Sequence, residues 1–264
     1  MPSTFKSFVE RHALAVFIVL AYALSWWPWL WTVLSPETSP STILPCGPFF
    51  AALIVLAVLG RNHLKEFLRR IVHWNVAPRW YAVVLLMPLI LTIVAVLLNI
   101  MLGAEPLGSF ETPGPAQLVV RFLFIFVFIG LGEEPAWRGF ALPRLLKDYA
   151  PLVATFILGI VHMLWHLPLL GVEYDASNVV PWALALLGYS VVVTWLYLNT
   201  GGSLLLPALM HAAVNTSAVL FQMFNGRDLI QLWWLFAGLW VLAAVVVVAR
   251  YGSALRSGKQ APAT

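Results

Sequence analysis

The stretch FIGLGEEPAWR, residues 128–138, puts two adjacent carboxylates, Glu133 and Glu134, at the end of an apolar run that is long enough to enter a lipid bilayer. A charged side chain inside a membrane costs roughly 2.5–3.5 kcal/mol even on lenient insertion scales. Two acids at this depth must therefore be neutralised, paired or used in chemistry. Their partners have to come from the same helix or from other membrane-embedded segments.

The composition predicts an all-α, polytopic membrane protein that forms a single integral membrane domain over residues 1–264. The chain is 61% hydrophobic and 10% charged, whereas a soluble domain contains about 25% charged residues. The single Cys46 excludes an intrachain disulfide and a thiolate metal cluster. Hydrophobic runs of about 20 residues predict eight transmembrane helices, at 13–34, 43–60, 80–102, 116–138, 151–170, 180–199, 203–224 and 229–249.

The distribution of charge between the expected loops predicts the orientation. One side of this topology carries Lys6, Arg11, Arg61, Lys65, Arg69, Arg70, Arg79, Arg144, Lys147, Arg250, Arg256 and Lys259. The other side carries Glu37, Glu105, Glu111, Glu173, Asp175 and Asp228, with two arginines, Arg121 and Arg227. The positive-inside rule then predicts that both termini are cytosolic. We expect a multi-pass protein of a bacterial plasma membrane.

The basic stretch 61–79 is interpreted as a cytosolic loop that contacts anionic lipid headgroups. Membrane lipid is therefore an expected partner, and nucleic acid is not.

Ionisable and strongly polar residues of the membrane segments gather in the second half of the chain: Glu133, Glu134, Arg138, His162, His166, His211 and Asn215. Glu133 and His166 are 33 residues apart, so an antiparallel hairpin with its turn near Tyr149 brings them level. Pro151 is suited to the first turn of the returning helix. We therefore expect the fourth helix to continue past Arg138, with a kink at Pro143.

A carboxylate, two imidazoles and an amide in a membrane cavity suit the activation of water. Glu133 is the candidate general base, and His166 is the candidate for holding the water. His211 and Asn215 share a helix face at i,i+4, and they are candidates for donating hydrogen bonds to the oxyanion of a peptide carbonyl. Glu134 and Arg138, also at i,i+4, are interpreted as a structural ion pair.

These motifs resemble the CPBP intramembrane proteases, which include the Rce1-type CAAX prenyl proteases and bacterial relatives linked to bacteriocin immunity. The pattern is Glu133-Glu134-x-x-x-Arg138, then His166 before Leu167-Pro168, then His211-x-x-x-Asn215, within a motif region of 117–225. The resemblance implies an eight-helix, cytosol-facing endopeptidase for a membrane-associated or lipid-modified peptide or protein. It also implies that Glu133, His166, His211 and Asn215 form the catalytic set, with Glu134 and Arg138 in support.

The chain departs from the usual Phe-x-x-x-His form of the second motif, because His162 stands in the phenylalanine position. His162 is then either a packing histidine or an additional member of the site. Zinc is an alternative cofactor, with Glu133, His166 and His211 as its possible ligands. No H-E-x-x-H helix is present, so we expect water activation without an obligatory metal.

Other functional classes stay open at this point. A proton-coupled transporter also uses acids and histidines at mid-depth, although its halves commonly show repeat symmetry and the polar residues here lie in one half. A bis-histidine haem protein would leave Glu133 and Glu134 without a role. A non-catalytic membrane scaffold would tolerate conservative substitution of Glu133.

Overall fold

The computed structural model describes residues 4–35, 37, 45–170 and 175–256 of the chain. Every regular element within these ranges is a helix, which confirms the all-α prediction. The N-terminal half contains α1 (Thr4–Arg11), α2 (Ala13–Leu34), α3 (Gly47–Leu59), α4 (Arg61–Ile71) and α5 (Pro78–Met101). The C-terminal half contains α6 (Pro115–Ile125), α7 (Leu131–Glu134), α8 (Leu142–Leu145), α9 (Pro151–Trp165), α10 (Val179–Asn199), α11 (Leu205–Ser217) and α12 (Gly226–Tyr251).

Six helical segments of the described chain are long and apolar enough to cross a membrane: Ala13–Trp31, Pro78–Met101, Pro115–Leu145, Ala176–Asn199, Leu205–Met223 and Gly226–Ala254. The prediction of a polytopic membrane protein is therefore confirmed, whereas its count of eight spans is not. The segments expected at 43–60 and 151–170 form shorter apolar helices, Gly47–Leu59 and Pro151–Trp165. At 1.5 Å per residue neither reaches across a roughly 30 Å hydrocarbon core without tilt or thinning.

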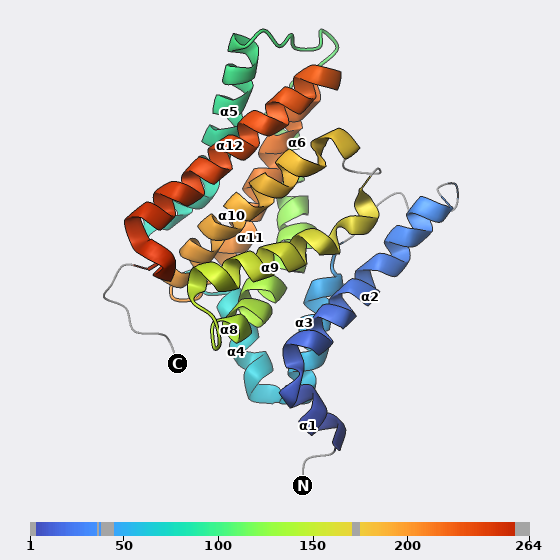
Figure 1. Cartoon of the computed structure of the whole chain (residues 1–264), viewed down its shortest axis with the longest axis vertical. Helices are drawn as coiled ribbons and strands as arrows, with labels where there is room; N and C mark the ends of the chain where they lie inside the picture. Colours follow the sequence, from blue (N-terminus) through green and yellow to red (C-terminus); the bar gives the residue numbers. More distant parts are fainter. Residues whose placement is uncertain (1–3, 36, 38–44, 171–174, 257–264) are drawn as a thin grey trace.

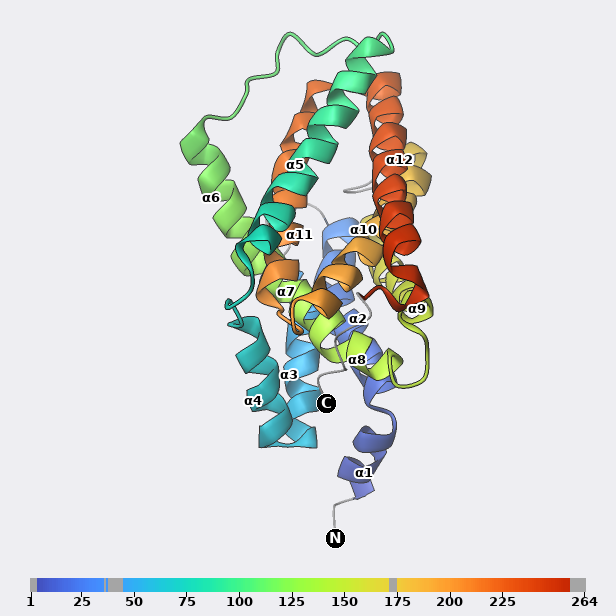
Figure 2. The same cartoon turned by 90° about the vertical axis from the view of Figure 1, so that its left-hand side faces the viewer.

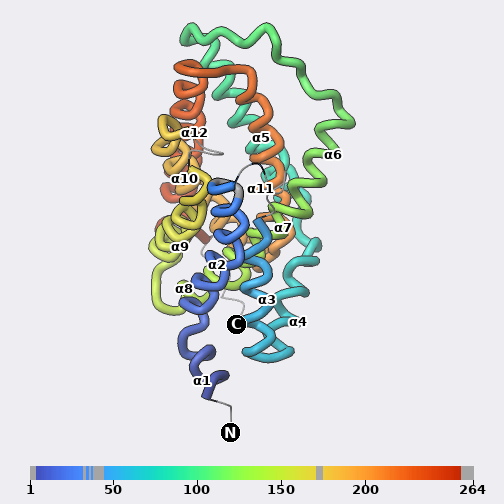
Figure 3. The backbone as a smooth tube through the Cα atoms, turned by 90° about the vertical axis from the view of Figure 1, so that its right-hand side faces the viewer, coloured from blue at the N-terminus to red at the C-terminus, as the bar shows by residue number. Residues whose placement is uncertain are grey.

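The two ends of the molecule differ in what they contain. α1 and α4 lie towards one end, and the long connection between α5 and α6 lies at the other (Figures 1 and 2). We call these the terminal end and the distal end. α6 descends from that connection along the side of the molecule, as the tube in Figure 3 also shows. Glu173 and Lys259, which the charge pattern assigns to opposite sides, and residues 43–44 of the expected span 43–60 lie outside the described residues.

Local sequence explains where several helices begin. A proline occupies the first turn of α3, α5, α6 and α9, where its missing N–H leaves no helical hydrogen bond unmade. The turn between α10 and α11 uses Gly201 and Gly202, with φ of 65° and 75°, a region that side chains with a Cβ disfavour. This turn sends α11 back antiparallel to α10, so that both helices contribute to the same cavity.

The helical segment Pro115–Leu145 is widened on both sides of the two glutamates. Phe126–Gly130 and Pro135–Ala141 are π-helical and flank α7. Pro135 cannot donate a backbone hydrogen bond and its ring crowds the preceding turn, so a wider turn accommodates it. Gly130 permits a close approach of α11, since a Cβ there would lie 2.6 Å from the Ala208 carbonyl oxygen. The helix continues to Leu145, as expected, through these wider turns.

The distal end of α9 is held by aromatic side chains from α2. The Tyr22 hydroxyl donates to the Val161 carbonyl at 2.5 Å, and Trp26 Nε1 donates to the Trp165 carbonyl at 2.9 Å. Trp29 packs against Trp165 with ring centroids 4.6 Å apart and ring planes inclined at 60°. The Trp165 carbonyl is one of the last four of α9, which lack partners within the helix, so Trp26 satisfies an acceptor that would otherwise face the apolar interior. The bond from Tyr22 to Val161 adds a second link between α2 and α9.

Candidate active site

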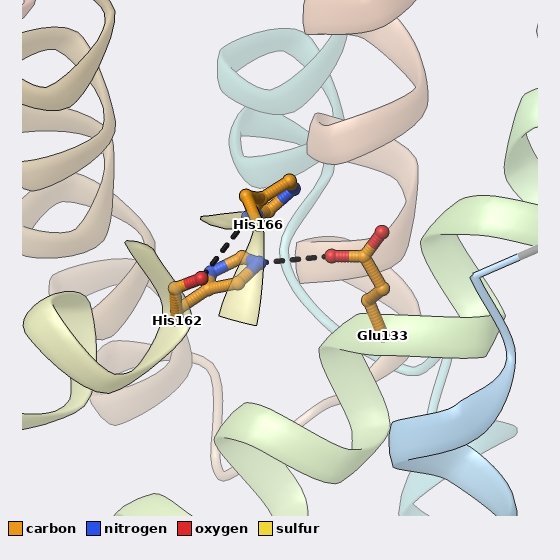
Figure 4. Close-up of side chains that lie close together, drawn as sticks. All are labelled: Glu133, His162 and His166. Carbon is orange, nitrogen blue, oxygen red and sulfur yellow. Dashed lines mark hydrogen bonds and ion pairs between the residues drawn. The ribbon is translucent and has the colours of Figure 1, made fainter. Parts of the chain in front are cut away.

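Glu133 meets a histidine from the returning helix. Its Oε2 accepts a hydrogen bond from His162 Nε2 at 2.9 Å, and both residues are almost completely buried (Figure 4). An ionised carboxylate can only accept, so Nε2 carries the proton in this pair and Nδ1 is the unprotonated nitrogen of a neutral ring. The Trp137 and His162 ring centroids are 5.0 Å apart, which fixes the plane of the imidazole. Glu133 therefore has a neutral hydrogen-bond donor as its close partner.

His166 lies one turn beyond His162, at the C-terminal cap of α9. Its Nδ1 donates to the His162 backbone carbonyl at 3.0 Å (Figure 4). A carbonyl oxygen can only accept, so the proton of a neutral His166 sits on Nδ1 and Nε2 is the ring's acceptor. The ring centroids of His162 and His166 are 5.1 Å apart. The local helix end thus sets the tautomer that the ring presents to its surroundings.

Glu134 is the centre of a separate, fully buried network. Arg138 Nη1 lies 3.0 Å from its Oε2, which confirms the predicted i,i+4 ion pair. Its Oε1 accepts from the Tyr189 hydroxyl at 2.9 Å and from His211 Nδ1 at 3.0 Å. Three helical segments, α7, α10 and α11, therefore converge on one carboxylate. The guanidinium of Arg138 compensates the charge of the Glu134 carboxylate, whereas the close partner of Glu133 is a histidine.

A cavity of about 550 Å³ brings the predicted residues together. Its lining includes Glu133, His162, His166, His211 and Asn215. Aromatic side chains form much of the remaining wall: Trp29, Phe124, Trp165, Trp182, Phe221, Trp233, Phe236 and Trp240. Arg121 also lines the cavity, and its Nη2 donates to the Asn215 backbone carbonyl at 3.4 Å. A few polar groups on an apolar wall are typical of a site that binds a largely apolar ligand.

The structure differs from the expected arrangement in two contacts. The hairpin brings His162, one turn before His166, against Glu133, although its turn near Tyr149 and its start at Pro151 are as expected. The His211 ring is hydrogen-bonded to Glu134 and not to Glu133. His211 and Glu133 nevertheless line the same cavity.

Tyr189 is a site residue that the sequence analysis did not single out. A tyrosine in an apolar helix carries no sequence signal, since Tyr commonly packs at interfaces between helices. Its hydrogen bond to Glu134 becomes visible only when α10 is placed beside α7.

Three side chains are close enough to share a metal ion. The possible ligand atoms of Glu133, His162 and His166 all lie within 4.8 Å of one another. A carboxylate and two imidazoles with an open position are a donor set of the catalytic zinc type. This set differs from the one considered from sequence, because His211 is hydrogen-bonded to Glu134 and His162 takes its place.

Comparison with known proteins bears on the class of this site. Residues 115–217 match the family model described as type II CAAX prenyl endopeptidase, Rce1-like. The chain is also 27% identical over 219 residues to the CAAX prenyl protease 2 of Methanococcus maripaludis, an alignment that covers 76% of this chain and 78% of the relative. The matched segment contains Glu133, Glu134, Arg138, the three cavity histidines and Asn215.

Proposed function

We propose that this chain, which residues 115–217 assign to the Rce1-like family of type II CAAX prenyl endopeptidases, cleaves peptide bonds with a water molecule activated by Glu133. The chain is a membrane-embedded peptidase, and the family match decides against the transporter and scaffold alternatives. One observation carries the assignment of the base. Glu133 lines the cavity beside histidines, whereas the adjacent Glu134 takes the arginine.

The first step is the attack of water on the peptide carbonyl. Glu133 accepts one proton from the water, and His166 Nε2 accepts a hydrogen bond from its second O–H and so fixes its orientation. The water oxygen forms a bond to the carbonyl carbon, and the carbonyl π electrons move to the oxygen. The histidine tautomer required for this role, protonated on Nδ1, is the one that the backbone carbonyl of His162 favours.

The oxyanion that forms needs donors on the other side of the cavity. Asn215 has an amide N–H₂ that can donate, and His211 can donate from Nε2 when the ring carries both protons. Nδ1 of His211 already donates to Glu134, so the doubly protonated ring would face a carboxylate that compensates its charge. Removal of one donor of this kind typically lowers kcat by about 10²–10³-fold.

The second step is the departure of the amine. Glu133 returns its proton to the peptide nitrogen as the carbon–nitrogen bond breaks, and the carbonyl is restored as a carboxylic acid. One water is consumed, and Glu133 regains its initial state. His162 acts as a positioning residue in this sequence, because its N–H holds the carboxylate that must alternately take and give the proton.

We propose further that no metal is required. The hydrogen bond between His162 and Glu133 uses one atom from each of two of the three possible ligands. A metal would require the proton to leave His162 Nε2 and the carboxylate to turn from histidine to metal. If a metal were bound, Glu133, His162 and His166 would hold it, and it would supply a more acidic water.

Purified protein is therefore expected to keep its peptidase activity after prolonged treatment with a strong chelator. Elemental analysis of the same sample should find well under one zinc per chain. His162→Phe is the informative companion variant, since it removes one possible ligand and restores the residue type usual at this position. Stoichiometric zinc in the wild type, absent from His162→Phe, with activity lost on chelation and restored by zinc, would contradict direct water activation.

The substrate class follows from the walls of the cavity and from the family. The aromatic lining suits an apolar peptide segment or a lipid chain attached to the substrate, and the name of the Methanococcus maripaludis relative, CAAX prenyl protease 2, refers to a prenyl group. We propose a membrane-associated or lipid-modified peptide or protein as the substrate and surrounding lipid as the other partner.

Cells that carry Glu133→Gln in place of the wild-type protein are expected to accumulate an uncleaved membrane peptide. Quantitative mass spectrometry of membrane-fraction peptides, with a Glu111→Gln strain as the matched control, measures this directly. Glu111 is exposed and lies outside the cavity. Identical peptide profiles in the wild-type and Glu133→Gln strains would contradict the proposal.

A further inference from the structure

We propose that a second pocket of this molecule, which Arg79 and Arg250 line, binds the phosphodiester headgroup of an anionic phospholipid. The pocket has a volume of about 380 Å³ and is lined by residues of α5, α10 and α12. None of these residues lines the cavity that contains Glu133. The site is therefore separate from the candidate active site, and the inference does not depend on the peptidase chemistry.

The pocket lies where three membrane helices begin or end. Arg79 and Trp80 belong to the first turn of α5. Asn199 is the last residue of α10, and Arg250 and Tyr251 are the last two residues of α12. All three helices are long and apolar enough to cross a membrane. The ends of such helices lie at the level of the lipid headgroups, where Trp and Tyr are enriched. The pocket is therefore at the depth of the lipid phosphates.

Three aromatic rings form a row in the pocket, with an arginine at each end. The ring centroids of Trp80 and Trp195 are 5.0 Å apart, and those of Trp195 and Tyr251 are 5.7 Å apart. The Arg79 guanidinium lies over the Trp80 ring, 5.5 Å from its centroid, and the Arg250 guanidinium lies 5.8 Å from the Tyr251 centroid. A guanidinium held on a ring keeps the N–H groups at its edge for an acceptor. Each end of the row thus presents a positioned cation.

The charges of the two arginines have no acidic partner in the protein. Neither Arg79 nor Arg250 lies within 4 Å of a carboxylate in the part of the chain that the structure describes. The described lining of the pocket also contains no Asp or Glu. In contrast, Arg69 and Arg70 of the nearby α4 share the carboxylate of Glu66. The pocket therefore has two positive charges to offer to an anion.

The chemistry of the pocket favours a phosphate. The forked N–H groups of a guanidinium match two oxygens of a phosphate, and basic pockets between membrane helices suit lipid headgroups. Because the arginines stand at opposite ends of the row, a lipid with two phosphodiesters, diphosphatidylglycerol, can offer one phosphate to each.

The surface next to the pocket indicates that the phosphate belongs to a lipid and is not free in solution. Val83 also lines the pocket, one turn further along α5 than Arg79. Leu86 and Ile90 follow Val83 at i+3 and i+7 on the same helix face, and their side chains are 53% and 54% exposed. An acyl chain that leaves a headgroup in the pocket can pack along this apolar face.

Native mass spectrometry of the full-length protein in a neutral detergent tests the proposal. The protein is titrated with diphosphatidylglycerol and, separately, with phosphatidylcholine, which has no net charge. Arg79→Gln/Arg250→Gln removes both charges of the pocket. Arg11→Gln/Arg61→Gln is the matched control, because both of its arginines are exposed on the helices α1 and α4 of the terminal end and lie outside the pocket.

We expect the wild type to bind one diphosphatidylglycerol at least about tenfold more tightly than phosphatidylcholine, since hydrogen bonds between charged groups are stronger than neutral ones. Arg79→Gln/Arg250→Gln should lose this preference, and Arg11→Gln/Arg61→Gln should keep it. Equal affinity of the wild type for the two lipids would overturn the proposal. So would wild-type affinity in Arg79→Gln/Arg250→Gln, or an equal loss in the control.

Two further measurements complete the test. Excess inorganic phosphate should leave the binding of diphosphatidylglycerol unchanged, whereas displacement of the lipid would assign the pocket to free phosphate and overturn the lipid as its source. Arg79→Lys/Arg250→Lys replaces the glutamine variant if that variant does not fold. It keeps both charges and loses the forked donors, so it should bind diphosphatidylglycerol more weakly than the wild type. Unchanged affinity in this variant would contradict recognition of the phosphate by the two guanidiniums.

Discussion

Glu133→Gln is expected to lower kcat for peptide cleavage by at least about 100-fold, because a positioned general base contributes roughly 10²–10⁴-fold. The glutamine amide oxygen can still accept the hydrogen bond from His162, so the variant should insert and purify like the wild type. The change removes the ability to take a proton and little else. The measurement is kcat on the peptide that accumulates in cells, with purified protein in lipid nanodiscs.

Glu111→Gln is the matched control for this loss, since it makes the same chemical change at an exposed position outside the cavity. Its kcat should equal that of the wild type. If Glu133→Gln kept more than about a tenth of the wild-type rate, the loss would correspond to only about 1.4 kcal/mol. Glu133 would then not be the base.

Arg138→Met is expected to destabilise the folded protein by about 3–5 kcal/mol, the usual cost of removing one partner of a buried ion pair. Arg138 is 1% exposed and Glu134 is 0% exposed, so water cannot replace the lost guanidinium. The yield of folded protein and its midpoint of thermal unfolding in detergent should both fall, along with activity.

The double variant Glu134→Gln/Arg138→Met separates charge from packing. It leaves no uncompensated carboxylate, so it should unfold at a higher temperature than Arg138→Met alone. A single variant that unfolds like the wild type but has lost turnover would move Arg138 from a supporting role into the chemistry.

The sequence predicted the chemistry of individual helices better than the contacts between them. The Glu134–Arg138 pair was predictable because both partners lie on one helix at a fixed spacing, and the structure confirms it. The prediction that the hairpin brings His166 level with Glu133 was wrong by one helical turn, because His162 makes the contact. The predicted hairpin requires a regular α-helix between Glu133 and the turn. Residues 135–141 instead form wide π-helical turns, which have a smaller rise per residue. Glu133 therefore lies nearer the turn and meets His162.

The sequence could not separate the roles of the histidines for a similar reason. His211 and Glu133 both belong to the polar residues of the membrane segments, but rotation about the helix axis decides which of two adjacent glutamates His211 contacts. Packing of α11 against Gly130 sets that rotation, and His211 reaches Glu134. The catalytic assignment of His166, His211 and Asn215 remains a prediction, as does that of Glu133, which the Glu133→Gln variant tests.

The two hydrogen bonds from α2 to the end of α9 limit how far this protein can be reduced in size. The segment that matches the family begins at residue 115, yet the carbonyls of Val161 and Trp165 accept hydrogen bonds from Tyr22 and Trp26, each 139 residues earlier in the chain. A fragment made from the matched segment alone would lose both bonds and would leave the Trp165 carbonyl without its donor, beside His162 and His166. The smallest autonomous catalytic unit therefore includes α2, and a shortened version of the protein for engineering has to retain that helix.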